Sequence, residues 1–133
     1  MKKEIINSAK IARSSASTTA HATKAGNLVF VTGQLGYKPG FDPRADRHSE
    51  IGSLEEQTVQ VLENIKAILE EAGTNLENVV KRNVYLTHAG DFQAVFKIME
   101  RYFTSPVAST GVVTGLMRGG ARVEIDVIAA IPG

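Results

Sequence analysis

The chain has 133 residues, a length that predicts one domain over residues 1–133. Its net charge of +1 excludes strong attraction to nucleic acid or to an anionic membrane, and the absence of cysteine excludes disulfides, thiol nucleophiles and thiolate metal sites. No stretch is apolar enough for a signal peptide or for the ~20 residues of a membrane span, so we expect a cytoplasmic protein.

The first predicted elements are two strands of a hairpin, over residues 18–24 and 28–33, joined by a turn at 25–27. The second strand carries four apolar residues and then ends in Thr-Gly-Gln at 32–34. Two interpretations of this ending stay open. Either the ending is a β-bulge in which the threonine hydroxyl binds backbone, or it places that hydroxyl in a small polar pocket where the glycine lets the backbone come close to a ligand.

A long surface loop over residues 35–52, rich in Gly, Pro, Asp and Arg, separates the hairpin from a helix. Ser53 and Glu56 form a capping box at the start of the helix, and Gly73 is placed for a left-handed cap at its end. One face of this helix is apolar, with Leu54, Val61, Leu62, Ile65, Ile68, Leu69 and Ala72.

The remaining elements are a strand at 79–87, a helix at 91–103, and strands at 109–116 and 122–129 that are expected to pair through a hairpin at 117–121. The helix has Asp91 as its expected N-cap. Its apolar face consists of Phe92, Val95, Phe96, Met99 and Phe103.

This order predicts an α+β two-layer domain, with a mixed sheet and both helices on one face. In the last strand Val and Ile alternate with charged residues, so the charged face points away from the helices. Strands 28–33 and 109–116 carry apolar residues on both faces. This favours an oligomer in which a second copy covers the open face; a monomer with a solvated face is the alternative.

The chain resembles the RidA/YjgF family of small imine and enamine deaminases along nearly its whole length. The resemblance is carried by "KAGNLVFVTGQ", by "EEQTVQVLENIKAILEEAGTNLENVVKRNVYLT", by "DFQAVFKIMERYF" and by "VEIDVIAA", in this order and spacing. It implies a chorismate-mutase-like fold, with a mixed sheet of about six strands and two helices on one face. It also implies a homotrimer packed sheet to sheet, with a small-molecule ligand in the cleft between subunits.

The family reaction is hydrolysis of a 2-imino or 2-enamino acid, and the resemblance assigns site roles on that basis. Glu124 matches a glutamate that orients water near the imine carbon; a salt-bridged sheet residue is the alternative interpretation. Thr32 and Gly33 match the strand end that reaches the cleft, and Thr19 stands where many members have a tyrosine.

The cation that holds the substrate carboxylate in the family is missing. Ala108, in the stretch Pro-Val-Ala-Ser-Thr at 106–110, stands where the family has arginine, with Thr110 nearby in the expected site. We therefore expect a divergent subgroup whose substrate is not a simple 2-imino acid. Arg122 is the better substitute because it is expected to share a face with Glu124, whereas Arg118 is expected at a solvated hairpin tip.

Three functions remain open: an enamine or imine deaminase, a non-catalytic homotrimer with a metabolite-binding, regulatory or chaperone-like role, and a ribonuclease. The last is poorly motivated, because the charge is near neutral and no histidine pair is evident. The three histidines have no metal-ligand spacing. We expect no metal, no cofactor, and no nucleic-acid or membrane partner.

Overall fold

In the computed structural model, which describes residues 2–133, the longest helix is α1 (Leu54–Glu71), and it begins as predicted. The Ser53 side chain accepts the N–H of Glu56, and the Glu56 carboxylate accepts the N–H of Ser53. Gly73 has φ +87°, and the N–H groups of Gly73 and Thr74 bind carbonyls of the last turn. Both ends are thus fixed by local contacts.

The second helix, α2 (Phe92–Met99), is shorter than the predicted span and follows a 3-10 turn at Ala89–Asp91. Asp91 makes no side-chain capping bond, contrary to expectation, because its carboxylate binds Arg122. Phe92 is 53% exposed rather than buried; its ring stacks on that of Phe96, which packs against the core, with 4.4 Å between ring centroids.

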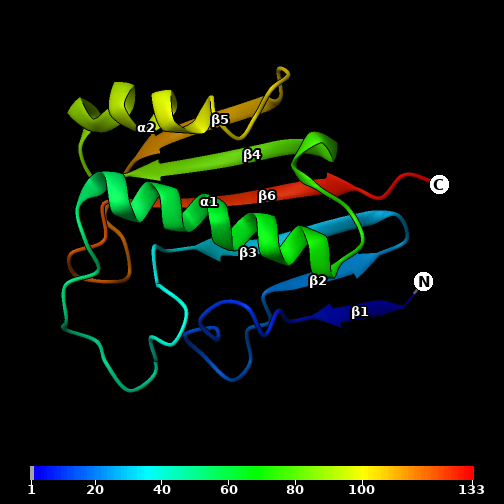
Figure 1. Ribbon diagram of the computed structural model, residues 1–133, viewed down its shortest axis with the longest axis horizontal. Helices are drawn as coiled ribbons and strands as arrows, with labels where there is room; N and C mark the ends of the chain where they lie inside the picture. Colours follow the sequence, from blue (N-terminus) through cyan, green and yellow to red (C-terminus); the bar gives the residue numbers. More distant parts are fainter. Residues whose placement is uncertain (1) are drawn as a thin grey trace.

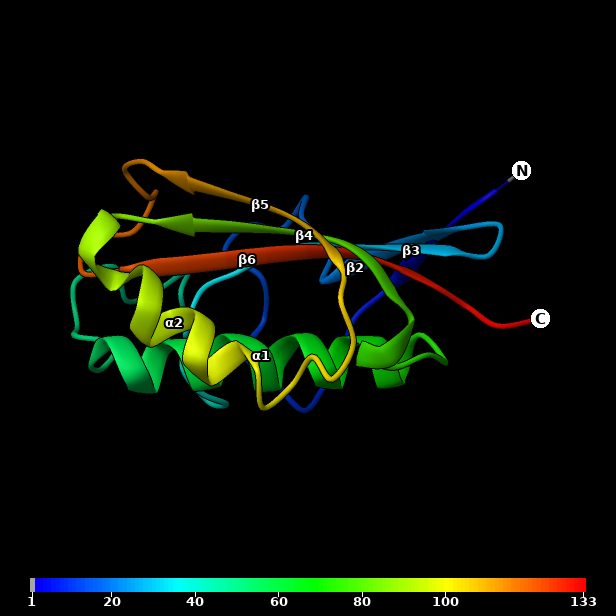
Figure 2. The same cartoon turned by 90° about the horizontal axis from the view of Figure 1, so that it is seen from above.

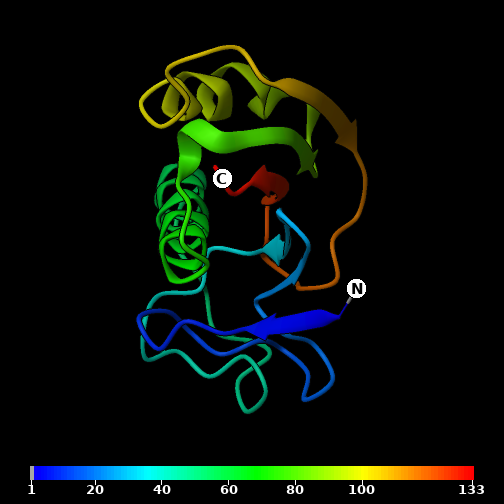
Figure 3. The same cartoon turned by 90° about the vertical axis from the view of Figure 1, so that its right-hand side faces the viewer.

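The two helices lie on one face of a six-stranded mixed sheet, as predicted (Figures 1, 2 and 3). The strands are β1 (Lys3–Ile6), β2 (Ala22–Ala25), β3 (Leu28–Gln34), β4 (Val79–Leu86), β5 (Ala108–Val113) and β6 (Val123–Ala130). Their order across the sheet is β1-β2-β3-β6-β4-β5. The β4–β5 pair is parallel, as expected for strands joined through a helix, and the other pairs are antiparallel.

Two strand predictions were wrong. The edge strand β1 was not expected, because its four residues show no alternation and all but Ile6 are exposed. The hairpin at 117–121 does not form, since β6 lies between β3 and β4. Burial explains this order: β6 buries alternate residues under the helices and occupies the centre, whereas every residue of β5 is exposed, which suits an edge.

The two faces of the sheet differ in chemistry. The helix-covered face holds the core, which includes Val29, Val84 and Ile125, each 0% exposed. The open face shows Phe30 at 40% exposure and partly buried Glu124 on the neighbouring strand. Within residues 2–133, neither helix is long and apolar enough to cross a membrane.

Candidate functional site

A pocket of about 160 Å³ lies at the end of β3 and brings together four of the predicted site residues. Thr19, Thr32, Gly33 and Glu124 all line it. The antiparallel pairing of β3 with β6 sets the end of β3 beside the start of β6, and the register shifts between Val31 and Gln34. This irregularity is the bulge that the Thr-Gly-Gln ending predicted as one of its two interpretations.

Gly33 and Glu124 are packed against each other in this pocket. A Cβ at Gly33 would overlap Glu124 Oε2 and lie 3.0 Å from Glu124 Cδ, so the carboxylate can keep this position only beside a glycine. Burial raises the pKa of Glu124, and the charge of Asp126 raises this pKa further. A glutamate with a raised pKa is suited to exchange protons as a general acid or base.

Thr32 lines the pocket and also binds backbone. Its Oγ1 donates to the Ala20 carbonyl oxygen at 2.6 Å, and its N–H donates to the His21 carbonyl at 2.9 Å. The two interpretations of the strand ending are therefore compatible, because Thr32 binds backbone and also faces the pocket. Because its hydroxyl proton is engaged, Thr32 offers a ligand only acceptor lone pairs.

Sequence reasoning missed several polar residues of the pocket, among them Asn64 and Arg13. Asn64 is 1% exposed, donates to the Tyr37 carbonyl at 3.1 Å and accepts from Gln60 at 2.8 Å. A polar residue within the apolar stripe of α1 was the signal that could have found it. Arg13 binds both carboxylate oxygens of Asp42, at 3.0 and 2.9 Å, so its charge is already compensated.

His21 forms part of the pocket wall and is 3% exposed. Its Nδ1 lies 3.0 Å from the N–H donor of Ser8, and its Nε2 lies 2.9 Å from the Ala12 carbonyl oxygen. This pattern assigns the proton to Nε2, and it ties the segment after β1 to the wall. Because both ring nitrogens are hydrogen-bonded to backbone, His21 has a structural role in the pocket wall.

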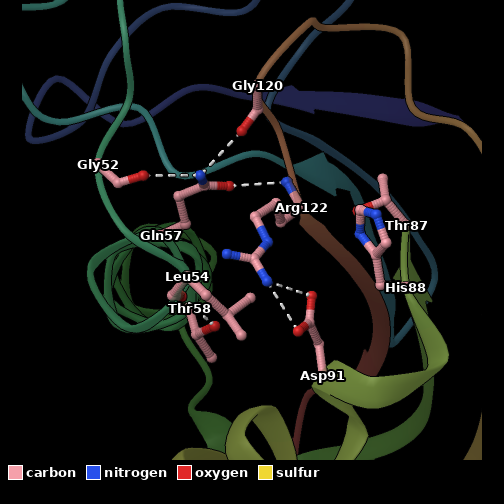
Figure 4. Close-up of polar contacts among 9 residues, drawn as sticks. All are labelled: Gly52, Leu54, Gln57, Thr58, Thr87, His88, Asp91, Gly120 and Arg122. Atoms are coloured by element: carbon pink, nitrogen blue, oxygen red, sulfur yellow. Dashed lines mark hydrogen bonds and ion pairs between the residues drawn. The ribbon is translucent and has the colours of Figure 1, made fainter.

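The expected shared face of Arg122 and Glu124 was wrong. Arg122 does not line the Glu124 pocket; its Nη2 lies 2.8 and 3.0 Å from the carboxylate oxygens of Asp91, on the helix side (Figure 4). Buried Gln57 fixes this stretch by donating to the carbonyls of Gly52 and Gly120 and by accepting the N–H of Arg122 (Figure 4).

The expectation of a solvated Arg118 was also wrong, because Arg118 is 7% exposed. Its guanidinium lies over the rings of Tyr37 and Phe41, 5.5 and 5.4 Å from their centroids. It donates to the carbonyl oxygens of Asp46 and Ser49. The residue thus organises the loop at 35–52, which the sequence could not show because the partners are distant in the chain.

Comparison with known proteins places the chain in a family. Residues 11–131 match the profile described as Endoribonuclease L-PSP. A RutC family protein of Pyrococcus abyssi is 39% identical over 111 residues, which cover 83% of this chain and 84% of that protein. The chain belongs to the RidA/YjgF family.

Two further RidA/YjgF relatives match almost the whole chain. The Reactive Intermediate Deaminase A of Arabidopsis thaliana, described as chloroplastic, is 36% identical and is matched over 98% of this chain and 67% of its own length. The crystal structure of RidA from an Antarctic Psychrobacter has a TM-score of 0.80 at 36% identity, covering 96% of this chain and 99% of that one. A cytoplasmic location for this chain stays a prediction.

The other predicted site residues, Ala108 and Thr110, lie on the exposed edge strand β5. Thr110 Oγ1 accepts from Lys81 Nζ at 2.6 Å, and neither residue lines the Glu124 pocket. Within one chain the predicted site therefore falls into two parts, separated across the sheet. Among residues 2–133 no group of three His, Asp or Glu side chains is placed to hold a metal.

Proposed function

We propose that this protein hydrolyses a small enamine or imine metabolite in a cleft between subunits of a homotrimer, and that its substrate is not a simple 2-imino acid. One observation carries the proposal: Glu124, its pKa raised by burial, lies against Gly33 in a small pocket. Membership of the RidA/YjgF family and a relative named Reactive Intermediate Deaminase A support this reaction class.

In this reaction Glu124 would carry two protons in turn. It takes a proton from water as the water oxygen bonds to the imine carbon, and it gives that proton to the nitrogen. It then takes the hydroxyl proton of the carbinolamine, and the carbon–nitrogen bond breaks as the nitrogen receives that proton. Overall, the imine and one water molecule are converted into a carbonyl compound and ammonia, and no cofactor is consumed.

A second copy of the chain would complete the cleft. The Glu124 pocket lies at the β3–β6 pair, whereas Ala108 and Thr110 lie on β5 at the edge of the sheet. A neighbouring copy could place its β5 beside this pocket, and exposed Phe30 offers apolar area for such contact. Ala108 offers a methyl group instead of a cation, which disfavours substrates that bind through a carboxylate.

Glu124→Gln tests the proposal directly, because glutamine keeps the shape and removes the proton carrier. Imines without a carboxylate are generated from amines by an amine oxidase, and 2-imino acids are generated by an amino acid oxidase. We expect the wild type to accelerate ammonia release from the former more than from the latter. Glu124→Gln should lose about 10²- to 10⁴-fold of that acceleration. Equal rates for the two proteins would contradict the role of Glu124.

Sedimentation velocity tests the assembly separately from the chemistry. The wild type is expected to sediment as three chains, and Phe30→Glu, which places a charge on the open face, should shift it towards one chain. Gln93→Glu, an exposed change on α2 that adds the same single negative charge, is the matched control. A wild type that sediments as one chain would contradict the cleft.

A non-catalytic metabolite-binding trimer is the second candidate. The observation in its favour is that the polar groups of the pocket are already occupied: the Thr32 hydroxyl proton is donated to Ala20, and Arg13 is paired with Asp42. Under this alternative a ligand binds equally to the wild type and to Glu124→Gln, and no imine tested is turned over.

A further inference from the structure

A second pocket, of about 300 Å³, lies between the end of α2, the loop that follows it at residues 103–107, and Arg82 of β4. It shares no lining residue with the Glu124 pocket. Its apolar walls come from Phe96, Met99, Phe103, Pro106 and Val107. The polar groups at this pocket are Arg82, Glu100, Thr104 and Ser105.

Arg82 is held in this pocket by aromatic rings and one hydroxyl. Its guanidinium carbon lies 4.7 Å from the ring centroid of Phe103 and 5.5 Å from that of Phe96. Its Nε donates to Ser109 Oγ at 3.0 Å. The rings and the hydroxyl fix the plane of the guanidinium, so its Nη edge is pre-organised to donate two parallel bonds.

This arginine lacks a built-in acidic partner. The ion pairs among residues 2–133 involve Arg13 and Arg122 but not Arg82. Burial lowers the pKa of Arg82, because a half-buried cation loses hydration, yet an arginine keeps its charge at neutral pH. A cation that is partly desolvated and unpaired attracts an anion more strongly than a solvated one.

We propose that this pocket binds a small monocarboxylate with an apolar body. The Nη edge of Arg82 takes the carboxylate in bidentate geometry, and the side chains of Met99 and Val107 receive the apolar part. Glu100 also lines the pocket, and its negative charge disfavours ligands with more than one negative charge. A branched-chain carboxylate therefore fits better than phosphate.

NMR titration of the ¹⁵N-labelled full-length protein tests the ligand class. Isovalerate should produce saturable shifts at the Arg82 side chain and at the backbone of residues 104–109. Its neutral amide, isovaleramide, should bind with at least tenfold lower affinity in the same titration. Inorganic phosphate should also bind with at least tenfold lower affinity than isovalerate. Equal shifts from isovalerate and isovaleramide would overturn the role of the charge. Stronger binding of phosphate than of isovalerate would overturn the monocarboxylate class.

Variants test whether Arg82 is the ligand-binding group. Arg82→Gln should abolish saturable isovalerate shifts, and Arg101→Gln is the matched control, because Arg101 is exposed nearby and loses the same charge. Ser109→Ala, a milder change that releases Nε, should weaken binding several-fold. Unchanged isovalerate affinity in Arg82→Gln, or in Ser109→Ala should Arg82→Gln not fold, would overturn the assignment. Glu124→Gln should bind isovalerate like the wild type, so this result is separate from imine hydrolysis.

Discussion

The Glu124 pocket and the Arg82 pocket are opposite in charge and in how that charge is compensated. The Glu124 pocket holds a partly buried carboxylate, and its one lining arginine, Arg13, is already paired with Asp42. The pocket beside α2 holds Arg82, which has aromatic and hydroxyl contacts but no acidic partner among the described residues. The comparison shows that a charged side chain is available to a ligand only where no oppositely charged residue of the protein is already paired with it.

Beyond the loss of activity expected for Glu124→Gln, restoring the missing cation is expected to have the largest effect. Ala108→Arg should raise the hydrolysis of 2-imino acids by about 10- to 100-fold, because a bidentate charge-assisted pair contributes roughly 1.5–3 kcal/mol. Release of 2-oxo acid from 2-aminoacrylate measures the rate. Ala108→Lys, a point charge without the planar fork, should gain less. An Ala108→Arg protein no faster than the wild type would show that the cleft is built differently from the proposal.

Filling the space under Glu124 should disrupt the acidic pocket itself. Gly33→Ala is expected to lower the free energy of unfolding by up to about 1 kcal/mol, because its Cβ forces the flexible Glu124 side chain to move. Urea denaturation measures the loss. Gly111→Ala, a strand glycine with open space at its Cβ, should change stability little. Equal losses in the two variants would mean that close packing against Glu124 is unimportant.

Removing the Asp91 carboxylate would leave Arg122 without its ion-pair partner. Asp91→Ala should lower the free energy of unfolding by roughly 1 kcal/mol, since the pair is only partly buried. The loss should shrink in 1 M NaCl, where charges are screened. Glu50→Ala, an exposed loop change, is the control. A loss that does not depend on salt would argue against the ion pair as its source.

The smallest expected effect is a stability gain in Glu124→Gln. The folded state raises the pKa of Glu124 above its ordinary value of 4.5, so the ionised form costs stability at neutral pH, and this cost disappears as the pH falls below the ordinary value. The variant should gain less than about 1 kcal/mol at pH 7, because the group is partly solvated. Urea denaturation at pH 7 and pH 4 measures it. A gain that is the same at both pH values would contradict burial of the charge as its cause.

Local signals in the sequence predicted the elements well. Ser53, Glu56 and Gly73 set the ends of α1 through contacts within a few residues, and alternation in β6 predicted which face meets the helices. The gathering of Thr32, Gly33 and Glu124 was predicted from the family resemblance. Arg82 was missed although it shares the strand parity of buried Val84, and that parity placed it under α2.

The sequence by itself determined the two helices, the mixed sheet and the polar ending of β3, because these depend on periodicity, capping and short-range turns. Only the tertiary structure decided that β6 lies in the centre, that Arg118 and Arg122 are held by the 35–52 loop and by Asp91, and that Arg82 is left unpaired. The reason is physical. A charge is neutralised by whatever group the fold brings within about 4 Å, and those groups lie dozens of residues away along the chain.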